Sequence, residues 1–244
     1  MTSSLAKFSA LLLTTVVLLQ GCANRSAQPV EPVVIRPVPQ KIALVAVQDP
    51  PMLNVENRGS ALAFFAFAGQ MVQKDLDRSR SIQLTSMMRG HALQLGDEMT
   101  AALQAELVRR GYTVQVLKNV KRVKDDPDAI DYDSIETDAE AIVSARYFGA
   151  GLFAGYLSTS YLPRLNVDIE VVAKSDQSEL HSHSIYYGVD ARRPEPDQIP
   201  SDAKYTYGSF EQAIERQREV LESYRVGVRQ IAALAATQLH QVGR

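Results

Sequence analysis

The sequence predicts an α/β fold, in which a mixed β-sheet of about five strands is packed by a central helix and a long C-terminal helix. A short apolar run at residues 42–47 is rich in β-branched side chains, as expected for a strand buried on both faces. Residues 89–110 and 209–242 carry apolar side chains at three- to four-residue spacing, which is typical of amphipathic helices. Residues 165–173 and 180–189 flank a Ser-Asp-Gln-Ser segment and therefore predict a β-hairpin.

The first half of the expected domain has the order strand, helix, strand. The helix predicted at residues 89–110 ends with two arginines and is followed by a glycine at position 111. Basic residues in the last turn and a glycine just beyond it are typical signals of a helix C-terminus. Residues 112–117 then predict a second strand, which completes a βαβ-type unit. The acidic residues 125–140 that follow predict a solvated connection with a short helix.

The second half of the domain adds a central strand, the hairpin and the last helix. Residues 141–154 are mostly apolar, and their glycines are expected to permit close packing or a bend of the strand. Ser209 is the expected N-cap of the last helix, with Gln212 at the position that completes a capping box. A stripe of apolar side chains then follows to the end of the chain, at Phe210, Ala213, Ile214, Leu221, Tyr224, Val228, Ile231, Ala235, Leu239 and Val242.

The residues before this domain have the composition of an export signal and a tether. Lys7 precedes a run of roughly ten apolar and threonine residues, which is too short to cross a hydrocarbon core of ~30 Å and is typical of a removable signal peptide. Prolines are frequent in residues 23–40 and favour an extended chain. We therefore expect a signal peptide at residues 1–21, a lipidated cysteine and Pro-rich tether at 22–40, and a single periplasmic α/β domain at 41–244.

The end of the signal peptide, Leu19-Gln20-Gly21-Cys22, resembles the lipobox of bacterial lipoproteins. The resemblance implies cleavage by signal peptidase before Cys22, a diacylglycerol thioether on its sulfur, and a fatty acid such as palmitate on the new N-terminus. Gln20 departs from the usual Ser or Ala, whereas the other three positions match. No Asp follows Cys22 directly, which in enterobacterial lipoproteins favours the outer membrane. We therefore expect a lipid-anchored protein on the periplasmic face of the outer membrane.

The mature domain resembles periplasmic α/β lipoprotein domains, such as the N-terminal domain of the Tol-system propeller protein and the curli secretion lipoprotein. This resemblance depends on element order and on the passage strand, helix, Arg-Gly-Tyr, strand between Lys41 and Leu117. The anchor, the spacer and the lack of a catalytic motif indicate a binding or accessory subunit of an envelope assembly for secretion or transport. The formal net charge of −2 predicts no strong attraction to nucleic acid. The expected partners are the membrane, through the anchor, and other envelope proteins or a second copy.

Few residues suggest chemistry. His181 and His183 would point to the same face of a strand, but a zinc site needs further ligands, so a solvated strand face is favoured. The acidic residues 125–140 do not have EF-hand spacing, and the glycines of residues 149–155 do not have that of a dinucleotide fingerprint. We therefore expect no enzyme, cofactor or metal. The alternative is an envelope hydrolase or a small-ligand carrier with an unrecognised site.

The segment ALAFFAFAG at residues 61–69 has two open interpretations. In one helix, Phe64, Phe65 and Phe67 cannot all face a single core, because neighbouring side chains are turned by ~100°. The segment is either core or a surface for a partner or the membrane. These three phenylalanines are therefore the candidate partner surface.

Replacing the cysteine tests the predicted anchor. Cys22→Ser removes the sulfur that would carry the diacylglycerol, so the variant should accumulate as an unlipidated precursor. Metabolic labelling with an alkyne fatty acid should mark the wild type and a Ser26→Ala control but not Cys22→Ser. Equal labelling of all three chains would refute the assignment.

Overall fold

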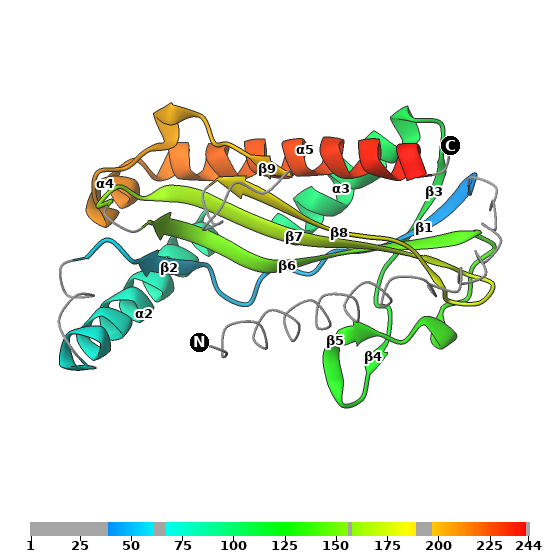
Figure 1. Cartoon of the computed structure of the whole chain (residues 1–244), viewed down its shortest axis with the longest axis horizontal. Helices are drawn as coiled ribbons and strands as arrows, with labels where there is room; N and C mark the ends of the chain where they lie inside the picture. The colour runs from blue at the N-terminus through cyan, green and yellow to red at the C-terminus, as the bar shows by residue number, and fades with distance from the viewer. Residues whose placement is uncertain (1–38, 61–66, 156–157, 189–196, 243–244) are drawn as a thin grey trace, which may run out of the picture. The chain divides into compact units, whose positions relative to one another are not determined.

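The computed structural model describes residues 39–60, 67–155, 158–188 and 197–242, and all of them belong to the unit Pro37–Arg244 (Figure 1). The predicted signal peptide, the lipobox and all but the last two residues of the predicted tether lie outside the described residues. Within the described part of the chain, no helix is both long and apolar enough to cross a membrane.

The fold is mixed α/β, as predicted. A seven-stranded sheet has the order β3-β1-β6-β7-β8-β9, and β2 pairs with β6 beyond the end of β1. β1 and β2 run parallel to β6, and β7 runs antiparallel to β6 and β8. The strands of this sheet are β1 (Lys41–Val45), β2 (Asn54–Asn57), β3 (Thr113–Leu117), β6 (Ala141–Ala154), β7 (Leu162–Ala173), β8 (Glu179–Gly188) and β9 (Gln198–Ile199).

Four α-helices are described, and two expected helix boundaries were wrong. The helix expected at residues 89–110 is α3 (Leu95–Arg109), and only its first two residues belong to α2 (Phe67–Gly90), most of which was not expected. The break between the two helices includes Ala92, whose φ of 51° is incompatible with a right-handed helix. The expected last helix is α4 (Phe210–Glu215) followed by α5 (Gln217–Val242). Ser209 caps α4 as predicted, because its hydroxyl accepts a hydrogen bond from the Gln212 backbone N–H at 3.2 Å.

The main core lies between the sheet and the helices α3 and α5, which pack side by side on one sheet face (Figure 1). The opposite face is covered by a smaller apolar cluster near β1. There Ile135 and Ala139 pack on the strands, together with the partly buried Ile130 and Tyr132. Residues 125–140, expected as a solvated connection with a short helix, do contain a short 3-10 helix at Tyr132–Ser134. They also contain a strand that was not expected, β5 (Asp126–Ile130), which pairs with β4 (Arg122–Val123) in a separate two-stranded sheet.

Side chains of α2 accept backbone hydrogen bonds from β2 and from the residue before it, as a neighbouring strand would. The backbone N–H of Val55 donates to Ser81 Oγ at 2.8 Å, and that of Leu53 donates to Thr85 Oγ1 at 2.9 Å. The N–H of Asn57 donates to an Asp77 carboxylate oxygen at 3.3 Å. Four helical residues rise ~6 Å and two strand residues rise ~6.6 Å, so acceptors at every fourth helix position match donors at every second strand position.

Removing the acceptors of this ladder should destabilise the domain. Ser81→Ala and Thr85→Val each leave a backbone N–H without its acceptor, and an unsatisfied buried donor costs about 1–3 kcal/mol. Urea unfolding should show losses of this size. Ser79→Ala and Ser86→Ala change exposed serines of the same helix and should stay within about 0.5 kcal/mol of the wild type. The same stability in all four variants would contradict the ladder.

Candidate functional site

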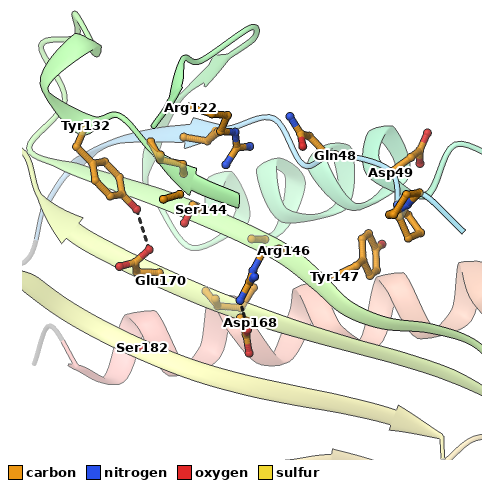
Figure 2. Close-up of a pocket in the computed structure, with 17 residues that line it drawn as sticks. Gln48, Asp49, Arg122, Tyr132, Ser144, Arg146, Tyr147, Asp168, Glu170 and Ser182 are labelled. Carbon is orange, nitrogen blue, oxygen red and sulfur yellow. Dashed lines mark hydrogen bonds and ion pairs between the residues drawn. The ribbon is translucent and has the colours of Figure 1, made fainter. Parts of the chain in front are cut away.

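An open groove of about 410 Å³ lies against the sheet face that α3 and α5 leave free (Figure 2). Its floor is formed by β6, β7 and β8. One wall is the segment that follows β1, at Gln48 to Pro51, and the other is the β4–β5 hairpin with Tyr132. Four regions that are distant in sequence therefore build one surface.

The floor of the groove is polar because of strand register. Side chains alternate between the two faces of a strand, so the face opposite the core receives Ser144 and Arg146 from β6. Arg146 lies across from Asp168 of β7, and its Nη2 contacts Asp168 Oδ2 at 3.1 Å. Ser184 of β8 donates a hydrogen bond to the other oxygen of Asp168 at 2.7 Å. One carboxylate thus links three adjacent strands.

A second polar contact joins the wall to the floor. The Tyr132 hydroxyl donates to Glu170 Oε2 at 2.8 Å (Figure 2). Burial, together with the neighbouring Glu170 carboxylate, raises the pKa of Tyr132 to about 12. The hydroxyl therefore keeps its proton at neutral pH and remains a hydrogen-bond donor. Arg122 of β4 lines the same wall and adds a positive charge beside this contact.

This arrangement is suited to recognition by hydrogen bonds. Asp168 and Glu170 both accept hydrogen bonds from neighbouring side chains, and the described lining includes neither histidine nor cysteine. The groove therefore presents hydrogen-bond donors and acceptors whose side chains are already held by neighbouring side chains.

Sequence reasoning missed this groove. Its signal was nevertheless present, because polar residues alternate with apolar ones in strands that are otherwise apolar, at Ser144 and Arg146 and again at Asp168 and Glu170. Such alternation predicts one polar face. The chain gave no local indication that the β4–β5 hairpin would form a wall over that face.

The two histidines lie elsewhere. His181 and His183 share a strand face, as expected, and their rings stack with centroids 5.9 Å apart. The expected solvated environment was wrong, because His183 Nε2 contacts Asp197 Oδ2 at 2.6 Å and Gln238 of α5 donates to Asp197 Oδ1 at 2.8 Å. Asp197 and Gln238 are distant in sequence from the two histidines, whose side chains are half-buried. Among the described residues, no group of three or more potential ligands is arranged to hold a metal.

The other predicted site residues fall mostly outside the described part of the chain. Cys22 and the motif before it lie there, as do Phe64 and Phe65, and Phe67 is described only as the first residue of the α2 backbone. The partner surface at these phenylalanines therefore stays a prediction. Further along α2, Met71 and Val72 are exposed.

No family model matches the chain, and no curated protein matches its sequence. Among solved structures, protein XCC0632 from Xanthomonas campestris is similar, with 10% identity, a TM-score of 0.43, and coverage of 86% of this chain and 89% of that chain. The lipoprotein GNA1162 from Neisseria meningitidis has 13% identity, a TM-score of 0.31, and coverage of 65% and 88%. The PelC dodecamer from Paraburkholderia phytofirmans has 11% identity, a TM-score of 0.29, and coverage of 62% and 71%. Likeness at this level assigns neither a partner nor an activity to the chain.

The environment of His181 predicts a pH effect on stability. Burial and the neighbouring His183 lower the pKa of His181 below its ordinary value of 6.5. The folded chain therefore binds this proton less readily than the unfolded chain, and stability is lost as the pH falls from 6.5 towards the lowered pKa. His181→Asn should flatten the dependence of the unfolding free energy on pH in this window, as measured by chemical denaturation. An unchanged slope would contradict the role of His181.

Proposed function

We propose that this chain is a lipid-anchored accessory subunit of a bacterial envelope assembly for secretion or transport, and that it acts by binding rather than by catalysis. The lipobox at Cys22 supports the anchor and a place on the periplasmic face of the outer membrane. The observation that carries the binding role is the groove, in which the carboxylates of Asp168 and Glu170 already have partners inside the protein.

Side chains that are already held by neighbouring side chains favour the binding of a partner for an energetic reason. A side chain that is already held by a neighbour loses little further freedom when a partner arrives, and this loss commonly costs about 0.5–1.5 kcal/mol for each mobile side chain. Arg146 is held by Asp168, and Tyr132 by Glu170.

The partner proposed for the groove is an extended segment of another envelope protein. The groove is open to solvent and is lined by Pro50, Pro51 and Ile130 as well as by the polar floor. Mixed lining of this kind fits a polypeptide, in which apolar side chains alternate with polar groups. A small ligand, by contrast, is usually enclosed over 70–90% of its surface.

The volume of the groove favours a second candidate function, that of a carrier of small ligands. Its volume of about 410 Å³ falls within the range of roughly 300–1,000 Å³ that is usual for ligand pockets. A protein partner and a small ligand would leave different products in one crosslinking experiment.

A photoreactive amino acid placed at Ser182, which lines the groove, tests the proposal in living cells. Irradiation should give a discrete high-mass adduct with one envelope protein. Ser175, an exposed residue of the β7–β8 turn, is the matched control and should give none. Arg146→Ala should reduce the adduct from Ser182, and Cys22→Ser should remove it if anchoring brings the partners together.

Two other results would change the assignment. A small molecule retained by the purified chain, with no protein adduct at Ser182, would favour the carrier. Equal adducts from Ser182 and Ser175, or none from either with no retained ligand, would refute a binding role for the groove.

A further inference from the structure

α2 has two faces of opposite character. Its inner face supplies the hydroxyl ladder to β2 and buries Leu84 and Met88, which are 0% and 2% exposed. Its outer face carries large apolar side chains that the domain does not cover. Half of the exposed large hydrophobic side chains of the described residues belong to this one helix, at Met71 (53%), Val72 (51%), Leu76 (41%) and Ile82 (57%). We call these four the α2 strip.

The ladder holds the α2 strip outward. At ~100° a residue, its four side chains fall within an arc of about 140° and extend over ~17 Å of helix. Ser81 and Thr85, on the inner face, are tied to the backbone of β2. Rotation of α2 to bury the strip would therefore break these hydrogen bonds, so the exposed apolar face is a stable property of the fold.

Basic side chains lie along one edge of the α2 strip. Lys74, Arg78 and Arg89 are exposed on α2, and Asp75, the one exposed acidic residue of this helix, falls within the arc of the strip. The other, Asp77, faces inward and is bonded to the Asn57 N–H and to Gln73. The chain as a whole has a formal net charge of −2, so the positive outer face of α2 runs against the overall balance.

We propose that the outer face of α2 docks on the surface of an anionic phospholipid bilayer, namely the membrane that holds the acyl chains of Cys22. Apolar side chains set among basic ones are the pattern of helices that lie in the interface of such membranes. The inference rests on the lipid anchor of the proposed function, because a tether of about 18 residues reaches only ~50 Å. The helix would be a second attachment point beside the lipid.

Charge distinguishes the bilayer from a second copy of the chain. Two α2 strips facing each other would bring Lys74 and Arg78 of one copy towards those of the other, and like charges at an interface oppose association. An anionic surface attracts the same residues, with about 1 kcal/mol for each Lys or Arg close to it.

A matched pair of valines tests the contact in the full lipidated chain. Val72 on α2 and Val108 on α3 are 51% and 52% exposed. Val72→Cys and Val108→Cys would be labelled with bimane and reconstituted into phosphatidylcholine vesicles containing phosphatidylglycerol. At position 72, emission should shift to shorter wavelength and be quenched by brominated lipid. At position 108 it should stay as in water.

Charge variants measure the strength of docking while the lipid anchor is unchanged. One kcal/mol corresponds to about a fivefold change in an equilibrium constant. Lys74→Ala combined with Arg78→Ala should therefore lower the ratio of docked to free helix about thirtyfold. Replacing phosphatidylglycerol with phosphatidylcholine should weaken docking in the same direction.

Three results separate the possible failures. Equal, water-like signals at positions 72 and 108 would overturn the proposal. A shift at position 72 that persists in detergent and grows with protein concentration would also overturn it, in favour of a second copy. Bimane uptake by a chain with no introduced cysteine would show a free Cys22 and refute the anchor alone, and the comparison of positions 72 and 108 in the Cys22→Ser background would then decide the helix contact.

Discussion

The pairing of β6 with β7 is the constraint on which the rest of the domain depends. Their antiparallel register extends from Ala141 opposite Ala173 to Phe153 opposite Leu162. A slip of β7 by one residue would exchange the two faces of that strand. It would turn Val167 and Ile169 out of the core that α5 covers and would place Asp168 within it, away from Arg146 of β6. The register therefore determines both where the core lies and where the polar groove can form.

An irregularity in β6 adapts this pairing to β2. The register shifts between Tyr147 and Gly149, so Phe148 is the extra residue of a bulge. Beyond the bulge, Gly151 has a φ of 146°, and a Cβ there would lie 1.8 Å from the Asn54 carbonyl oxygen of β2. The close packing expected from the glycines of this strand is thus confirmed. Because β2 is held at this position, its free edge is available to the side chains of α2.

The sequence predicted what depends on local pattern and missed what depends on distant partners. The strands β1, β3, β6, β7 and β8 and the cap at Ser209 were recognised, since hydrophobic periodicity and capping are local signals. β2 and β9 were missed because they are too short to show a period. The break between α2 and α3 was missed because the apolar spacing continues through Leu93 and Leu95, although the backbone turns at Ala92.

The candidate site was harder to predict for the same reason. Whether a polar side chain on a strand is merely solvated or lines a groove depends on what lies over that face. For Glu170 the covering residue is Tyr132, and for His183 it is Asp197. Neither contact has a spacing rule, because Tyr132 and Asp197 lie at no fixed interval in sequence from the strand residues that they contact. Side-chain alternation could at most have marked these faces as polar.

The groove and the α2 strip lie in different parts of the domain, so one surface can be occupied without covering the other. The groove lies over the middle of β6 and β7 beside the β4–β5 hairpin, whereas α2 lies beyond β2, at the other end of the sheet (Figure 1). A helix docked on a bilayer would therefore leave the groove open to a partner. It would also limit the orientations of the domain, as a second attachment point beside the lipid. A restricted orientation raises the effective concentration of the groove for a partner in the same envelope, without any new contact between the two proteins.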